Sequence, residues 1–118
     1  MALTTNILDQ TNGKPAANVL VELYLLMENS LQKELIHVSY TNEEGRTDEV
    51  LLTNEKIEVG EYELLFYIGD YFKEMKLETN GSTFLNMIPV RFGINDREAN
   101  YHVRFDVSTG GYQVYLGD

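Results

Sequence analysis

The chain has 118 residues and no cysteine, and its 19 acidic and 9 basic residues give a formal net charge of −10. The length fits one domain over residues 1–118, the hydrophobic content of 43% argues against disorder, and the lack of cysteine excludes disulfide scaffolds, thiolate metal sites and cysteine nucleophiles. The acidic balance argues against a nucleic-acid partner, and the sequence has neither an apolar run long enough to span a membrane nor a signal-peptide pattern, so we expect a cytoplasmic protein.

Alternation of apolar and polar residues with a period of two is the main pattern along the chain. It is clearest at 61–68 and 101–108, and it is typical of strands that bury one face in a core. In chain order, this pattern and the β-rich composition predict strands at Leu3–Leu8, Val19–Met27, Leu35–Thr41, Tyr62–Ile68, Met87–Ile94, Tyr101–Val107 and Tyr112–Leu116. About seven short strands separated by turn residues predict an all-β sandwich, in which Pro89 favours an edge strand or a bulge.

One segment lacks this alternation and follows the predicted strand that ends at Ile68. From Asp70 to Leu77, the apolar residues Phe72, Met75 and Leu77 fall on one side of a helix, and Asp70 is available as its cap. The sequence therefore predicts a short surface helix of about two turns between the fourth and fifth of these predicted strands.

The polar side chains that could carry chemistry are few. The chain has two histidines, His37 and His102, and neither has a second histidine at a metal-ligand spacing. A lone histidine on a strand is usually a hydrogen-bonded structural residue, and we interpret His37 in this way. His102 shares a strand face with Arg104 and Asp106, so this polar face is either solvent-exposed or a site. Arg46, in a turn of polar residues, is either a solvated charge or a clamp for an anion.

Several motifs occur together in an order that resembles one family. They are Leu3-Thr4-Thr5, Ile7-Leu8-Asp9, Gly13-Lys14-Pro15-Ala16, Thr41-Asn42, Gly45-Arg46-Thr47-Asp48, Tyr62-Glu63-Leu64, Gly69-Asp70-Tyr71-Phe72, Phe84-Leu85, Pro89-Val90-Arg91-Phe92, Tyr101-His102-Val103, and Gly111-Tyr112 followed by Tyr115 and Gly117. The chain resembles the transthyretin-like family, in particular its bacterial 5-hydroxyisourate hydrolases, from residue 3 to its last residue.

The resemblance of this sequence to the transthyretin-like family implies a transthyretin-like β-sandwich of two four-stranded antiparallel sheets, with one short helix after the fifth strand. It implies a homotetramer, built as a dimer of dimers, that binds a small-molecule ligand in the channel between the dimers. In the hydrolases the active sites lie at the channel mouths. The implied reaction is the hydrolytic ring opening of 5-hydroxyisourate in urate degradation, a part of purine metabolism, with no metal or organic cofactor.

The resemblance also implies a catalytic set, of which this chain keeps a part. The family has a histidine in the first strand, where this chain has Asn6, an arginine that matches Arg46, and a second histidine that matches His102. The implied catalytic residues are His102, as a base, and Arg46, which polarises a carbonyl group. The implied substrate-binding residues are Asn6, Arg46 and Tyr115, the last of which orients the ring.

The departures from the family pattern predict an impaired activity. Asn6 can hydrogen-bond a water or a carbonyl group, but it cannot take a proton near neutral pH and so cannot be a general base. The family closes on Tyr-Arg-Gly-Ser, whereas this chain closes on Tyr-Leu-Gly-Asp. Leu116 removes a cationic group, and Asp118 adds a carboxylate that would oppose an anionic substrate.

Two classes of function stay open. The first is a 5-hydroxyisourate hydrolase with an incomplete catalytic set. The second is a non-catalytic transthyretin-like tetramer that binds a small molecule or has a structural role. Because Asn6 and Leu116 make the channel mouth more apolar, the second class fits a hydrophobic or aromatic ligand. We favour the hydrolase, because Arg46, His102 and Tyr115 are retained together.

Overall fold

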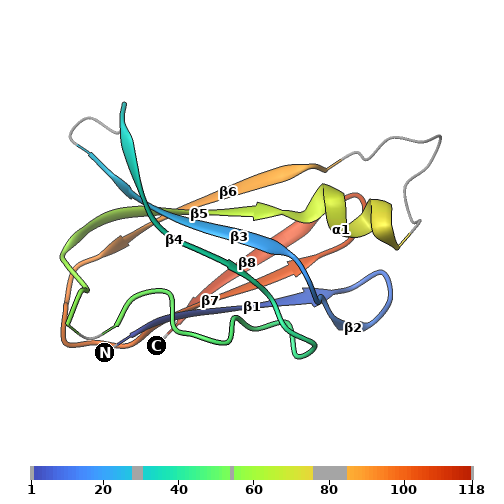
Figure 1. The fold of residues 1–118 in the computed structure, drawn as a ribbon, viewed down its shortest axis with the longest axis horizontal. Helices are drawn as coiled ribbons and strands as arrows, with labels where there is room; N and C mark the ends of the chain where they lie inside the picture. Colours follow the sequence, from blue (N-terminus) through green and yellow to red (C-terminus); the bar gives the residue numbers. More distant parts are fainter. Residues whose placement is uncertain (1, 28–30, 54, 76–84, 118) are drawn as a thin grey trace.

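The computed structural model describes residues 2–27, 31–53, 55–75 and 85–117. These residues form two four-stranded β-sheets that pack face to face, with a short helix toward one end of the sandwich (Figure 1). The elements are β1 (Leu3–Asp9), β2 (Lys14–Pro15), β3 (Leu20–Leu26), β4 (Lys33–Tyr40), β5 (Gly60–Tyr67), α1 (Ile68–Glu74), β6 (Met87–Ile94), β7 (Tyr101–Val107) and β8 (Tyr112–Gly117). The predicted all-β sandwich with a short helix is confirmed, and only the two-residue strand β2 was not expected among these elements.

The strand orders of the two sheets are β2-β1-β7-β8 and β4-β3-β5-β6. Neighbouring strands pair antiparallel except β1 and β7, which run in parallel from Leu3 opposite Tyr101 to Asp9 opposite Val107. The first sheet is therefore mixed, which corrects the expectation of two purely antiparallel sheets. Sequence alternation identifies the faces of a strand but not its direction relative to a distant partner. The pairing brings the two chain ends together at one end of the molecule (Figure 1).

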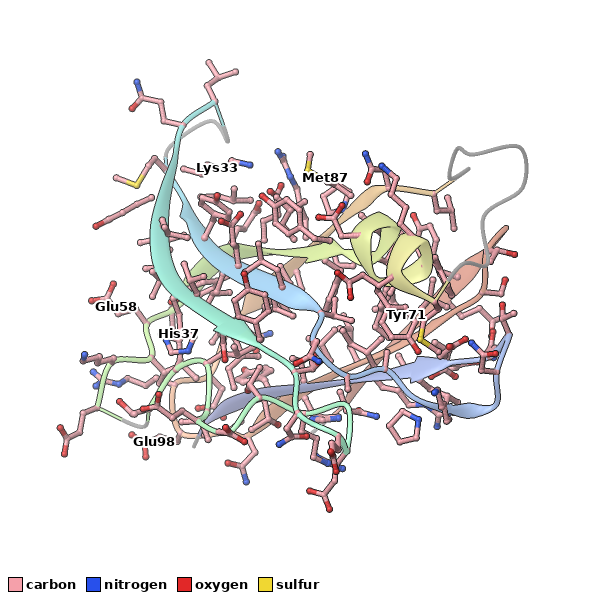
Figure 2. All side chains as sticks on the ribbon, turned by 45° about the vertical axis from the view of Figure 1, so that its right-hand side comes forward. Lys33, His37, Glu58, Tyr71, Met87 and Glu98 are labelled. Carbon is pink, nitrogen blue, oxygen red and sulfur yellow. The ribbon has the colours of Figure 1, made fainter. Side chains whose placement is uncertain are left out.

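The hydrophobic core lies between the two sheets. Burial alternates residue by residue along β1, and Phe66 of β5 stacks on Phe105 of β7 with ring centroids 4.3 Å apart. Figure 2 shows how side chains fill the space between the sheets. Strand β6 lies at the edge of its sheet, as Pro89 predicted, since proline has no N–H group to donate to a further strand. Because the core takes one face of each strand, the other face of each sheet points outward.

Helix α1 begins at Ile68, two residues before the predicted start at Asp70. The backbone N–H group of Gly69 donates to the carbonyl oxygen of Asn86 at 2.9 Å, and Asn86 also fills the space that a Cβ atom at Gly69 would take. Asp70 lies in the first turn and is not the cap; Tyr67 holds that position without a side-chain hydrogen bond. Phe72 is buried as predicted, whereas Leu77 lies outside the described residues. No helix in the described part of the chain is long and apolar enough to cross a membrane.

The end of β1 is fixed to the helix by one buried carboxylate. Asp9 accepts hydrogen bonds from the Tyr71 hydroxyl at 2.6 Å and from the backbone N–H and side-chain amide of Asn12 at 3.0 and 2.7 Å. Burial and the Asp9 carboxylate both raise the pKa of Tyr71, so its hydroxyl keeps its proton and remains a donor. This network anchors the strand that carries part of the site described next.

Candidate functional site

The outward face of the sheet β2-β1-β7-β8 gathers most of the predicted site residues. His102 lies opposite Thr4 of β1, and Arg104 lies opposite Asn6 of β1 and Tyr115 of β8. We call this surface the His102 face and define it by Thr4, Asn6, His102, Arg104, Asp106, Gln113 and Tyr115, together with Arg46 from the loop beside β1. The shared orientation of His102, Arg104 and Asp106, expected from their alternation, is confirmed.

His102 is held through both ring nitrogens. Its Nδ1 lies 2.7 Å from the Thr4 hydroxyl, and its Nε2 lies 2.5 Å from Oδ1 of Asn6. Because an amide oxygen only accepts hydrogen bonds, Nε2 carries the hydrogen and donates a hydrogen bond to Asn6 Oδ1. Burial first, and the positive charge of Arg46 second, lower the pKa of His102, so the imidazole is neutral near pH 7. In the neutral ring, Nδ1 accepts the hydroxyl proton of Thr4.

Arg46 reaches this face because a tight turn brings its backbone against β1. Gly45 has a φ of +77°, and a Cβ atom there would lie 2.5 Å from the carbonyl oxygen of Ile7, so both conformation and space call for glycine. The N–H group of Ile7 donates to the Gly45 carbonyl at 2.9 Å, and Arg46 forms a β-bridge with Asn6. The Arg46 side chain is exposed and makes no ion pair with any described residue.

The second arginine of the face is clamped between a carboxylate and an aromatic ring. Arg104 donates from Nε and Nη2 to the two carboxylate oxygens of Asp106, at 2.9 and 2.8 Å. Its guanidinium carbon lies 5.1 Å from the ring centroid of Tyr115, and the Tyr115 hydroxyl donates to Gln113 at 2.6 Å. Sequence reasoning placed Arg104 and Asp106 on this face but missed the clamp, which depends on Tyr115 in the neighbouring strand.

The two C-terminal departures from the family pattern have different outcomes. Leu116 is 60% exposed and lies opposite the core residue Val103, so its side chain is on the other side of β8 from Tyr115. The apolar character expected of the channel mouth stays a prediction, and the His102 face itself carries Arg104 and Asp106. Asp118 lies outside the described residues.

His37, the other histidine, belongs to the other sheet. It lies in β4 opposite the core residue Leu23, and its buried Nε2 has no hydrogen-bond partner among the described residues, contrary to the expected hydrogen-bonded role. Figure 2 places it toward one end of the sandwich and Tyr71 toward the other. Within the described ranges, no three residues of the types His, Asp or Glu are grouped closely enough to hold a metal ion.

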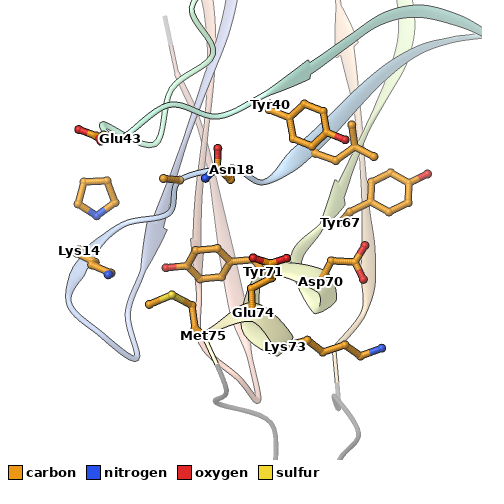
Figure 3. Close-up of a pocket in the computed structure, with 13 residues that line it drawn as sticks. Lys14, Asn18, Tyr40, Glu43, Tyr67, Asp70, Tyr71, Lys73, Glu74 and Met75 are labelled. Atoms are coloured by element: carbon orange, nitrogen blue, oxygen red, sulfur yellow. The ribbon is translucent and has the colours of Figure 1, made fainter.

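A hollow of about 990 Å³ lies elsewhere, beside α1 (Figure 3). Tyr40, Tyr67, Tyr71, Asp70 and Lys14 are among its lining residues, whereas His102, Arg46 and Tyr115 are not. The predicted site residues thus lie on the outward face of the sheet, apart from this hollow.

Comparison with known proteins extends this description. Residues 3–117 match the HIUase/Transthyretin family. The chain is 45% identical over 115 residues to the 5-hydroxyisourate hydrolase of Halalkalibacterium halodurans, a match that covers 98% of this chain and 96% of that protein. The crystal structure of (S)-allantoin synthase is similar to this structure, with a TM-score of 0.90 and 34% sequence identity. The match covers 99% of this chain and 43% of the allantoin synthase chain. Transthyretin from Sparus aurata, at 20% identity, a TM-score of 0.86 and coverage of 98% and 96%, has the same fold. The chain therefore belongs to the HIUase/transthyretin family.

Proposed function

We propose that this protein hydrolyses 5-hydroxyisourate, opening its ring at an amide bond. The observation that carries the proposal is the hydrogen-bonded series Thr4–His102–Asn6, which holds a neutral imidazole in one tautomer on a face with Arg46. A positioned neutral histidine is suited to take a proton from water near neutral pH. The hydrolase of H. halodurans, 45% identical, supports the choice of substrate.

His102 is the proposed general base, and it acts through the Thr4 hydroxyl. A water molecule gives a proton to Thr4 Oγ1 while Thr4 passes its own proton to Nδ1 of His102, and the water oxygen bonds to the ring carbonyl carbon. Collapse of the tetrahedral intermediate breaks the C–N bond, and the proton returns to the leaving nitrogen by the same route. Asn6 accepts a hydrogen bond from Nε2–H and so stabilises the imidazolium that forms between the two proton transfers.

Arg46 is the proposed stabiliser of the carbonyl oxygen as negative charge develops on it. Its guanidinium is exposed and without an ion pair among the described residues, so its donors are available. Tyr115, half exposed on the same face, is the proposed platform that orients the substrate ring. Asn6 positions His102 through its oxygen and can offer its amide N–H groups to the substrate. No metal or organic cofactor enters these steps.

One assay tests this function. 5-Hydroxyisourate is generated from urate with a uricase, and its decay is followed with and without micromolar protein. We expect the protein to accelerate the decay. If the decay rate with the protein equals the rate without it, the hydrolase proposal is rejected. The remaining candidate is then a non-catalytic ligand-binding tetramer.

We further propose that residues 1–118 act as a single cytoplasmic domain that assembles as a homotetramer, a dimer of dimers with the His102 faces lining its channel. Exposed apolar side chains on the edge strands β6 and β8, including Met87, Tyr112 and Leu116, support association there. Because each chain carries a charge of −10, the tetramer should loosen at low ionic strength and tighten with added salt. Sedimentation that gives a monomer at every salt concentration would contradict the channel.

A further inference from the structure

Arg104 is the cation of the His102 face to which the proposed reaction gives no role. It lies two residues from His102 on the same side of β7, about 7 Å along the strand. It also lies directly between Asn6 of β1 and Tyr115 of β8. A group in this position borders both the proposed base and the proposed aromatic platform.

The guanidinium of Arg104 is held in a fixed orientation. Two of its N–H groups are fixed by the carboxylate of Asp106, whose side chain is 2% exposed, and its central carbon lies over the Tyr115 ring, 5.1 Å from the ring centroid. An arginine side chain normally loses conformational entropy about several rotatable bonds when it binds a ligand. Here Asp106 and Tyr115 already restrict that freedom, so a ligand would meet a preorganised cation.

The contacts with Asp106 and Tyr115 leave part of the Arg104 guanidinium free to bind. Of the five N–H donors of a guanidinium, two donate to Asp106, and the other three have no partner among the described residues. The Arg104 side chain is 51% exposed, so these donors can be reached from outside the protomer. Because both oxygens of Asp106 already accept hydrogen bonds, satisfying that buried carboxylate does not require the remaining donors.

We propose that Arg104 is a substrate-binding residue that recognises the carbonyl oxygens, or their anionic form, of a cyclic imide or ureide lying beside His102. Asp106 and Tyr115 act as positioning residues for it. Parallel N–H donors in one plane match two neighbouring oxygens of such a ring, which a single ammonium group does not. The inference rests on the proposed function for the identity of the reaction, but the binding of the ring can be measured separately.

The test compares two half-exposed arginines that each pair with a buried carboxylate. Arg104→Gln is expected to raise the KM for 5-hydroxyisourate about 10- to 100-fold and to leave kcat within a few-fold. It is expected to weaken the binding of urate, a non-reacting probe, by a similar factor in titration calorimetry. The matched control is Arg91→Gln, which removes a half-exposed arginine paired with the buried Glu63 on the other sheet and should change neither value. Arg104→Lys should recover only part of the affinity.

The outcomes separate this inference from the proposed function. Hydrolysis with an unchanged KM and urate affinity in Arg104→Gln would overturn the role of Arg104 and leave the function intact. Urate binding that depends on Arg104, without hydrolysis by the wild-type protein, would support Arg104 and reject the hydrolase. A wild-type protein that neither hydrolyses 5-hydroxyisourate nor binds urate would overturn both. Because Arg104→Gln leaves Asp106 unpaired, the Arg104→Gln/Asp106→Asn variant provides the same comparison with the buried charge removed.

Discussion

The outward faces of the two sheets carry the same kind of ion pair in different surroundings. On the sheet β4-β3-β5-β6, Glu63 is 4% exposed and accepts from Arg91 at 3.0 Å and from Lys33 at 2.9 Å. On the His102 face, Asp106 is 2% exposed and accepts two hydrogen bonds from Arg104 alone. Both pairs place a buried carboxylate on a sheet surface beneath a half-exposed arginine.

The surroundings differ in charge balance. On the face with Glu63, a second carboxylate, Glu22, accepts hydrogen bonds from the hydroxyl groups of Tyr24 and Tyr67. The hydrogen bond from Tyr67 is the main cause that raises the pKa of Tyr67 to about 12. Lys33 and Arg91 are thus matched by two carboxylates. The His102 face has two arginines and one carboxylate among its defining residues, together with a neutral histidine.

This difference suggests which face binds a ligand. Polar groups that satisfy one another stabilise a surface and leave little to offer to a substrate. A local excess of positive charge in a chain of net charge −10 attracts an electron-rich ring and leaves donors to bind it. The four predictions below test the contrast between the two faces.

The largest effect is expected from the two histidines, one on each sheet. His102→Ala should lower kcat/KM for 5-hydroxyisourate about 10²- to 10⁴-fold, because it removes the proposed base. His37→Ala, in β4, should leave the rate of the folded protein unchanged. Both are measured by the uricase-coupled decay assay. An equal loss in the two variants, or no loss in His102→Ala, would show that the chemistry does not belong to the His102 face.

A stability effect is expected on the other face. Although burial by itself would raise the pKa of Glu63, hydrogen bonds from Lys33 and Arg91 lower it, so the carboxylate is charged at neutral pH. Glu63→Gln should reduce the free energy of unfolding by about 1–3 kcal/mol, with KM unchanged. The exposed neighbour Glu61 provides the control, since Glu61→Gln should change that free energy by less than about 0.5 kcal/mol. Urea denaturation followed by circular dichroism gives both values.

A smaller kinetic effect is expected at Thr4. Thr4→Val keeps the shape of the side chain but removes the hydroxyl that donates to Nδ1 of His102, and we expect a roughly tenfold lower kcat. Thr4→Ser retains the hydroxyl and should retain most of the rate. If Thr4→Val and Thr4→Ser are equally active, the proton does not pass through this hydroxyl.

The smallest effect is a shift in pH dependence. Arg46 helps to lower the pKa of His102, so Arg46→Gln should raise that pKa. Since a base works only when unprotonated, activity is lost as pH falls through this pKa, and the acid limb of kcat/KM should move to higher pH. NMR titration of the His102 ring measures the same shift without activity. A shift toward lower pH would contradict the electrostatic role given to Arg46.

Much of the architecture could be predicted from the sequence because the relevant signals are local. Alternation located the strands, and Pro89 indicated an edge strand. The parallel pairing of β1 with β7 is a contact between distant segments, and local periodicity carries no information about it. The early start of α1 at Ile68 depends on the close contact between Gly69 and Asn86, which is also distant in the sequence.

The resemblance to a family singled out Asn6, Arg46 and His102, and the structure brings these three residues together. Their role as a site stays a prediction. The role of Thr4 as a partner of His102 could not be seen, because it follows from the register between β1 and β7. For the same reason the sequence did not show that Leu116 pairs with Val103 and lies on the other side of β8 from Tyr115. Residue identity is local, whereas the partner across a sheet is set by register.

The most direct test of the contrast between the two faces is an NMR titration of isotope-labelled protein with urate. It follows the side-chain signals of His102 and Arg104 on one sheet, and of His37 and Arg91 on the other. We predict saturable shifts for His102 and Arg104 and none for His37 and Arg91. Shifts confined to His37 and Arg91, or to the tyrosines of the hollow beside α1, would contradict the assignment of the His102 face as the binding site.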